Sequence, residues 1–185
     1  MDKKEVLLKL ARTAIAEEFG IDYGVDKEEL HRQNPWLEEE GAAFVTLNSK
    51  GNGALRGCIG SIIAHQSLYE DVVRNAKSAA FHDPRFVALS PEEFENITVE
   101  VSVLTPPERV FYESVADLKS KLRPGIDGVI LREGSYQATF LPQVWEQLPD
   151  FELFMSHLCQ KAGLSQECLN RHPDIYLYRV EKYHE

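Results

Sequence analysis

The sequence predicts an α+β fold built largely on antiparallel sheets. Two pairs of short segments with strand-like alternation are each joined by a Gly-rich turn, which is the pattern of a β-hairpin. Helical segments lie between the hairpins without forming repeated βαβ units. In a chain of 185 residues with 43% hydrophobic and 27% charged residues, these elements can enclose a substantial core.

The N-terminal part is predicted to be a helix followed by an irregular segment. Apolar residues between 3 and 19 recur at the spacing of one helix face. Asp2 is a suitable N-cap, and Gly20 is a suitable end of the helix. Residues 21–40 are polar and contain Gly and Pro, so we expect a loop with one short helix.

Residues 41–62, GAAFVTLNSKGNGALRGCIGSI, have the pattern of two antiparallel strands joined by a Gly/Asn/Ser turn. Side chains alternate between the two faces of a strand. One face therefore carries Leu55, Gly57 and Ile59, and the other carries Arg56, Cys58 and Gly60. This places Arg56 and Cys58 side by side.

The hairpin is followed by a helix, a turn and a strand. Ser67 begins a helix that runs to about Ala80 and ends in FHDPRF, because Pro84 disfavours helical geometry at the residue before it. Ser90 begins one short helix. In NITVEVSVLTPP the apolar residues alternate with polar ones, which predicts a strand whose polar face includes Glu100.

The remainder is predicted to contain a helix over 114–122, a second hairpin formed by GVILRE and YQATFL, and a helix over 151–162. IYLYRVEKY closes the chain as one strand. The chain is interpreted as a single domain over residues 1–185, and any division into subdomains is expected near the Pro-rich stretch at 105–107.

Composition narrows the class of protein. The formal net charge of −10 makes nucleic acid an unfavourable partner, and no basic residues are interleaved with aromatic ones in the sequence. No apolar run is long enough to cross a membrane. The cysteines, at 58, 159 and 168, are odd in number and form no CxxC pair. This argues against a disulfide framework and for a reducing compartment, so we expect a cytoplasmic protein in which Cys159 and Cys168 are core residues.

Cys58 is the first candidate for chemistry, although a free cysteine in a strand is commonly a core residue. Arg56 on the same face would favour its reactive thiolate form. Gly57 and Gly60 would leave the neighbouring surface bare, so that a substrate or a partner backbone could approach. Both interpretations of Cys58 remain open.

A nucleophilic thiol needs a base, and His82 in FHDPRF is the candidate. Asp83 and Arg85 in the same turn either belong to the site or simply pair with each other. Glu100 would need a partner such as Arg56 or Arg85 if its face is covered, whereas on an open face it would be solvated. The sequence has no metal-ligand spacing or cofactor-binding motif, so no metal or cofactor is predicted in this chain.

LRGCIGS, from Leu55 to Ser61, resembles the signature of the family named for the AMME chromosomal region (AMMECR), whose prokaryotic members are called AmmeMemoRadiSam system protein A. AFHDPRF, VEVSVL, GIDGVIL, ATFLPQVWEQLPD, LCQKAGL and YLYRVEKY are similar to the family in order and spacing. The resemblance covers essentially the whole chain. It implies an α+β fold of two unequal subdomains, with the motif strand near a cleft between them. It also implies a site at Leu55, Arg56, Gly57, Cys58, Ile59, Gly60, Asp83, Pro84, Arg85 and Glu100.

Two functional hypotheses follow. In the first, the chain is an enzyme or enzyme component that acts on an unknown small molecule, protein or RNA, together with the Memo-like and radical S-adenosylmethionine partners that the resemblance implies. Cys58 would then be the reactive thiol, and Glu100 or His82 would move protons. Iron or S-adenosylmethionine would belong to the partners. In the second, the chain is a non-catalytic adaptor whose Gly-flanked strand recognises a partner peptide, an anionic ligand or RNA.

Overall fold

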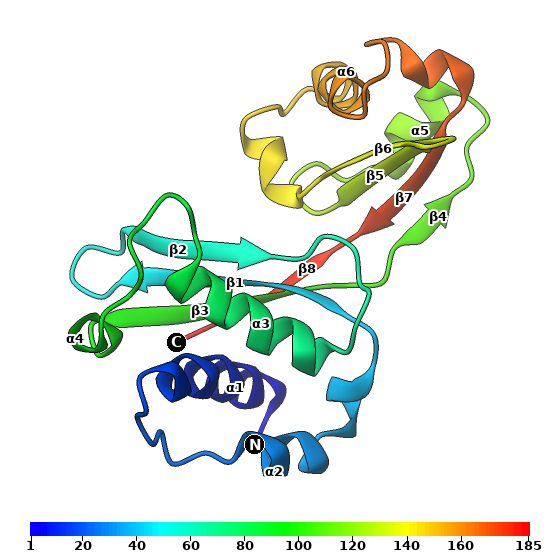
Figure 1. Cartoon of the computed structure of the whole chain (residues 1–185). Coiled ribbons are helices and arrows are strands. Elements are labelled where there is room, and N and C mark those ends of the chain that lie inside the picture. The colour runs from blue at the N-terminus through cyan, green and yellow to red at the C-terminus, as the bar shows by residue number, and fades with distance from the viewer. The chain divides into compact units, whose positions relative to one another are not determined.

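The computed structural model describes all residues from 1 to 185, and the chain divides into two units (Figure 1). Unit 1 comprises residues 1–104 and 181–185, and unit 2 comprises residues 105–180. The chain enters unit 2 directly before the prolines at 106 and 107. Each unit contains a four-stranded sheet with antiparallel hairpins, so the predicted α+β class is confirmed.

Unit 1 combines one sheet with four helices. Its strands lie in the order β2-β1-β3-β8. The elements are α1 (Lys3–Glu18), α2 (Lys27–Gln33), the 3-10 helix η1 (Pro35–Glu38), β1 (Ala42–Ser49), β2 (Leu55–Gly60), α3 (Leu68–Phe81), α4 (Pro91–Phe94), β3 (Ile97–Leu104) and β8 (Val180–His184).

Local sequence signals account for most of these elements. Asp2 caps α1 through a capping box with Glu5, and Ser90 caps α4 through a second one. The apolar residues of β1 and β3 alternate as expected, and they pack against α1 and α3 in one core. Both helices thus contribute to the core on one face of the sheet, where the side chains include Leu7, Leu10, Val45, Leu47, Val72, Ala76, Val99 and Val101.

A buried polar cluster ties α3 to the sheet. The Asp71 carboxylate is fully buried and accepts hydrogen bonds from the backbone N–H of Ala43 at 2.8 Å and the Ser61 hydroxyl at 2.6 Å. The Asn75 amide donates to the same carboxylate at 3.0 Å and to the Ala43 carbonyl at 3.0 Å. Gln66 and Arg74 complete the cluster, so the buried charge has hydrogen-bond partners on every side.

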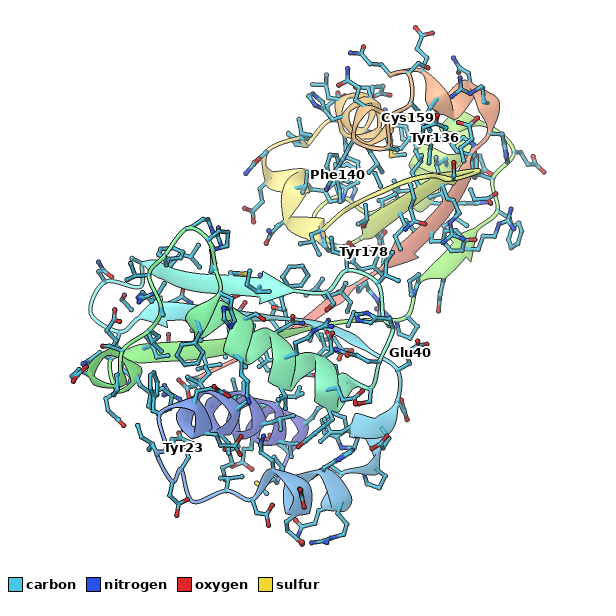
Figure 2. All side chains as sticks on the ribbon, viewed as in Figure 1. Tyr23, Glu40, Tyr136, Phe140, Cys159 and Tyr178 are labelled. Atoms are coloured by element: carbon cyan, nitrogen blue, oxygen red, sulfur yellow. A yellow bond between two sulfur atoms is a disulfide. The ribbon has the colours of Figure 1, made fainter.

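Unit 2 has strand order β4-β7-β5-β6. Its core lies between one face of this sheet and the helices, and it includes Leu118, Val129, Leu131, Phe154, Leu158 and Ile175. The Tyr178 hydroxyl donates to the Phe140 carbonyl at 3.1 Å (Figure 2). The elements are β4 (Glu108–Val110), α5 (Val115–Lys121), β5 (Gly128–Glu133), β6 (Tyr136–Phe140), η2 (Pro142–Glu146), α6 (Phe151–Lys161), η3 (Cys168–Arg171) and β7 (Asp174–Tyr178).

The prediction of one closing strand is wrong, because IYLYRVEKY contributes to two sheets. Its first part is β7 in unit 2, and its second part is β8 beside β3 in unit 1. β4 is also absent from the sequence prediction, since it is only three residues long and is defined by its pairing with β7. No helix of the chain combines the length and apolar character needed to cross a membrane.

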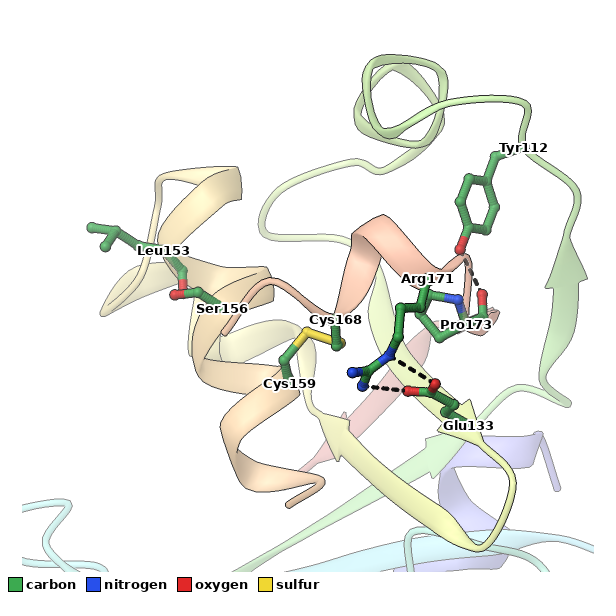
Figure 3. Close-up of a disulfide and its surroundings, with 8 residues drawn as sticks. All are labelled: Tyr112, Glu133, Leu153, Ser156, Cys159, Cys168, Arg171 and Pro173. Carbon is green, nitrogen blue, oxygen red and sulfur yellow. Dashed lines mark hydrogen bonds and ion pairs between the residues drawn. A yellow bond between two sulfur atoms is a disulfide. The ribbon is translucent and has the colours of Figure 1, made fainter. Parts of the chain in front are cut away.

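The interpretation of Cys159 and Cys168 as unpaired core residues is also wrong, because a disulfide joins them (Figure 3). Cys159 lies in α6 and Cys168 begins η3, and both are fully buried. The argument from cysteine number for a reducing compartment therefore fails. A disulfide does not by itself place the chain outside the cytoplasm, since intracellular proteins of hyperthermophiles also contain them.

We expect loss of this disulfide to destabilise unit 2 by about 2–3 kcal/mol, because the bond closes a short loop in the unfolded chain. The measurement is urea unfolding of a Cys159→Ala, Cys168→Ala variant in a Trp36→Phe background, followed by the fluorescence of the remaining tryptophan, Trp145, which is buried in unit 2. Cys58→Ala is the control and should leave this transition unchanged. A thiol titration of the unfolded, unreduced chain that counts three thiols instead of one would contradict the disulfide.

Candidate functional site

β2 is an edge strand that pairs only with β1, and its glycines have packing roles. A Cβ atom on Gly57 would lie 2.1 Å from the Ala79 carbonyl oxygen of α3. A Cβ atom on Gly60 would lie 2.2 Å from the Phe44 ring. These contacts correct the expectation that Gly57 and Gly60 leave bare surface, because α3 occupies one position and an aromatic ring the other.

Cys58 lies on the face of the sheet opposite α3, and it is half-buried and free. β1 places Thr46 directly opposite Cys58, and the Thr46 hydroxyl lies 3.3 Å from the Cys58 sulfur. On the other side of Thr46, β3 places Glu100 directly opposite the same residue. Cys58, Thr46 and Glu100 therefore form one row across three strands, which we call the thiol row.

The backbone of Cys58 is held by the turn that follows α3. Its N–H donates to the Asp83 carboxylate at 2.9 Å, and its carbonyl accepts from the Arg85 guanidinium at 3.3 Å. Arg85 also makes two side-chain hydrogen bonds to Asp83, at 3.0 and 2.7 Å. This arrangement, the Asp83–Arg85 clamp, occupies edge groups of β2 that would otherwise be open to another strand, and it confirms that these two residues pair.

The clamp depends on the charge of Asp83. Hydrogen bonds from Arg85 and from the Cys58 backbone hold the pKa of the buried Asp83 carboxyl far below its usual range, although burial opposes this shift. The same pairing with Asp83 raises the pKa of the Arg85 guanidinium. Asp83 and Arg85 are therefore ionised throughout the neutral pH range.

We expect Asp83→Asn to lower the free energy of unfolding near neutral pH by about 1–2 kcal/mol, because charge-assisted hydrogen bonds are lost. Since the pKa of Asp83 is lower in the folded than in the unfolded chain, its contribution is present above the ordinary pKa of about 4 and declines as the pH falls below it. Urea unfolding of both proteins across this range tests the prediction. A difference that grows as the pH falls would contradict it.

Arg56 is paired with Glu93, which sequence reasoning did not identify as a site residue. The guanidinium makes two hydrogen bonds to the Glu93 carboxylate, at 2.9 and 3.0 Å, and this pairing lowers the pKa of Glu93. Arg56 is thus bonded to Glu93 and Arg85 to Asp83, so neither of the two partners considered for Glu100 on a covered face is hydrogen-bonded to it. The hydrogen bond to Glu100 comes instead from the hydroxyl of Ser102, at 3.2 Å.

The remaining predicted residues occupy different surroundings. Ile59 packs against the core of unit 1, while Leu55 is 41% exposed and Pro84 is exposed. His82 ends α3, and no hydrogen bond joins its ring to the Cys58 sulfur. The structure thus brings Cys58, Asp83 and Arg85 together and leaves His82 unconnected to the thiol.

No metal site is formed by the side chains of the chain. No three His, Cys, Asp or Glu side chains lie in an arrangement that could bind a metal ion. The site therefore consists of a thiol, a hydroxyl and a carboxylate on a sheet, with an ion pair holding the backbone beneath the thiol. The fold and the site together define this chain as a two-unit α+β protein that carries a thiol on an antiparallel sheet.

This chain belongs to the AMMECR1 family, whose model matches residues 8–183. It is 39% identical to a protein of Methanothermobacter thermautotrophicus over 190 residues, which cover 100% of this chain and 95% of that protein. It is 40% identical to a protein of Saccharolobus solfataricus, over 88% of this chain and 72% of that protein. The crystal structure of an uncharacterized protein from Pyrococcus horikoshii is similar, with a TM-score of 0.75 and 37% identity, covering 100% of this chain and 93% of that one.

Proposed function

We propose that this chain is an enzyme or enzyme component of the AmmeMemoRadiSam system, and that Cys58 is its reacting group. The observation that carries the proposal is the thiol row above the Asp83–Arg85 clamp. The clamp fixes the backbone of Cys58 on both sides of the residue, and Thr46 contacts its sulfur. Functional groups act efficiently when their surroundings hold them in one geometry.

Each member of the thiol row has a distinct proposed role. The Thr46 hydroxyl can donate a hydrogen bond to a thiolate and thereby favour the charged form of the sulfur. Glu100 lies two strands from Cys58, and two strand spacings are about 10 Å. This separation is too large for a direct hydrogen bond, so Glu100 would act on a bound substrate rather than on the sulfur.

The remaining parts of the proposal concern location and partners. A Memo-like protein and a radical S-adenosylmethionine protein are the proposed partners, and iron or S-adenosylmethionine is assigned to them. We place the chain in the cytoplasm with these partners. The substrate class is an unknown small molecule, protein or RNA that reaches the thiol row in unit 1.

A non-catalytic adaptor is the second candidate, and two observations favour it. The ring of His82 makes no hydrogen bond to the Cys58 sulfur, so the thiol has no histidine base beside it. The Arg56 guanidinium is already paired with Glu93, so it is not free to stabilise a Cys58 thiolate as the enzyme hypothesis requires. In this alternative, the face that carries the thiol row receives a peptide, an anionic ligand or RNA, and Cys58 is simply small enough to fit.

Reconstitution with the two proposed partners distinguishes the candidates. The measurements are co-purification and the consumption of S-adenosylmethionine by the mixture, for Cys58→Ser, Cys58→Ala and the wild type. The enzyme proposal predicts that both variants co-purify but lose the effect of the chain on consumption. The adaptor predicts that both variants retain it.

Thr98→Val is the matched control, because Thr98 lies on the same face of β3 as Glu100 but outside the thiol row. It should behave as the wild type, whereas Thr46→Val should reduce the effect on consumption. If the wild-type chain neither co-purifies with the partners nor alters consumption, membership of the system is contradicted for both candidates.

A further inference from the structure

We propose that unit 2 carries a second binding surface, on the face of its sheet opposite the helices, which takes single-stranded nucleic acid. The surface consists of Arg109, Phe111, Arg132, Gln137 and Tyr176, and we call it the Arg–aromatic face. It is independent of the thiol row, which lies in unit 1. The sequence gives no sign of it, because its residues come from four separate strands or strand ends.

Strand register places these side chains on one face. Arg109 of β4 lies opposite Tyr176 of β7, and residues directly opposite one another point to the same side of a sheet. Arg132 of β5 lies opposite both Asp174 of β7 and Gln137 of β6, two residues along from the first pair. The helices pack on the other face, where Val129, Leu131 and Ile175 point into the core.

Each of the two arginines is stacked on an aromatic ring. The Arg132 guanidinium lies 5.3 Å from the centre of the Tyr176 ring, and the Arg109 guanidinium lies 5.1 Å from the centre of the Phe111 ring. Phe111 is 74% exposed, so its ring is available to a ligand. The face therefore interleaves cationic and aromatic groups, the arrangement on which proteins stack the bases of single strands.

The charges of this face suit a phosphate backbone. Arg109 pairs with Asp174 at 2.7 Å, but the hydrogen-bond partner of Arg132 on this face is the neutral side chain of Gln137 at 3.0 Å. The Arg–aromatic face with Asp174 thus has a net charge of +1. Unit 2 as a whole has 8 Lys and Arg against 10 Asp and Glu, so eight of the ten excess negative charges lie in unit 1.

The total charge of −10 therefore describes unit 2 poorly, because unit 2 itself carries a net charge of only −2. An acidic peptide would use the arginines but would gain little from the exposed ring of Phe111. A base can stack on that ring or on a guanidinium plane, while Gln137 offers hydrogen bonds to a base edge. The observations therefore favour a nucleic acid strand over an acidic peptide.

The test is fluorescence anisotropy of labelled uridine and thymidine oligonucleotides with the full-length chain, at several salt concentrations. We expect binding at low salt that weakens as salt rises. Phe111→Ala should weaken binding by about tenfold, because one base loses its stacking partner. Arg132→Gln should weaken binding and reduce the slope of log affinity against log salt by about one.

Two variants serve as matched controls. Tyr136→Ala removes an exposed aromatic residue that packs near Gly163 at the end of α6 (Figure 2), and Arg171→Gln removes an arginine paired with Glu133 (Figure 3). Both should bind as the wild type does. A stronger signal with uridine or with thymidine oligonucleotides identifies RNA or DNA as the ligand.

The proposal is overturned if neither oligonucleotide binds at low salt, or if Phe111→Ala binds as tightly as Tyr136→Ala. It is also overturned if a polyglutamate peptide binds to the same face with a dependence on Arg132 but not on Phe111. These outcomes leave the proposed role of Cys58 untouched, since no residue is shared between the two surfaces.

Discussion

Asp71→Ala is expected to lower the free energy of unfolding of unit 1 by about 3–4 kcal/mol, because it leaves buried hydrogen-bond donors without an acceptor. The backbone N–H of Ala43 and the side chains of Ser61 and Asn75 all donate to this carboxylate. Water cannot easily replace it, since Asp71 is fully buried. The measurement is urea unfolding followed by far-ultraviolet circular dichroism.

Glu70→Ala is the matched control for this prediction. Glu70 is the preceding residue of α3 and also a carboxylate, but it is exposed. Its replacement should lower the free energy of unfolding by no more than about 1 kcal/mol, because it loses only a hydrogen bond from the Ser67 hydroxyl and a favourable position in the first turn of α3. Equal effects of the two variants would show that the buried cluster does not hold α3 on the sheet.

Gly57→Ala is the second change with a large expected effect, about 3 kcal/mol of lost stability in unit 1. The added methyl group would lie 2.1 Å from the carbonyl oxygen of Ala79, which is part of the backbone of α3 and cannot rotate away. Either β2 or α3 must therefore shift. Because Cys58 follows Gly57 directly, the same shift should disturb the Asp83–Arg85 clamp.

Gly51→Ala provides the control, since a Cβ atom at Gly51 would meet no atom within 4 Å and the residue does not have a positive φ. Urea unfolding should separate the two variants clearly. If Gly57→Ala costs less than about 1 kcal/mol, the close approach of β2 to α3 is not a constraint on this position.

Elements defined by local signals could be predicted from the sequence. The capping box at Asp2, the positive-φ glycine at position 163 and the alternation in β3 each act within a few residues of the chain. The division of the closing segment into β7 and β8 could not, because its two halves pair with strands of different sheets and nothing in IYLYRVEKY interrupts the strand pattern. The division is set by pairing with strands that are distant in the sequence, not by the local pattern.

The candidate site was predictable as a set of residues but not as a set of contacts. Alternation correctly placed Cys58 away from Gly57, and the turn correctly brought Asp83 and Arg85 together. The pairing of Arg56 with Glu93 spans 37 residues and has no local signal. The expected cleft between the two units stays a prediction, as do the roles assigned to Glu100 and His82.

Thr46 shows how a small irregularity can hide a site residue. Counting back from the turn, where Asn48 lies opposite Leu55, would place Thr46 opposite Gly57. A bulge between Leu47 and Asn48 shifts the register by one residue, so Thr46 lies opposite Cys58 instead. The burial of Val45 and Leu47 could have revealed this, because those residues require Thr46 to face the same side as Cys58.

The disulfide could not be predicted either, because it also depends on the local path of the chain. Cys159 and Cys168 are nine residues apart, and their pairing depends on the turn at Gly163 that reverses the chain after α6. The odd number of cysteines favoured free thiols, yet it is satisfied equally well by one disulfide and one free Cys58. Cysteine number alone therefore could not choose between the two.

The most direct test of Cys58 as the reacting group is the rate at which iodoacetamide labels it in the wild-type chain. This rate is measured at increasing urea concentrations below the unfolding transition. If the thiol is accessible on the sheet face, labelling should proceed readily without urea. Its rate should then barely change across this range of urea concentrations. If labelling is negligible in the native protein and rises in step with global unfolding, Cys58 is sealed within the fold and cannot be the reacting group.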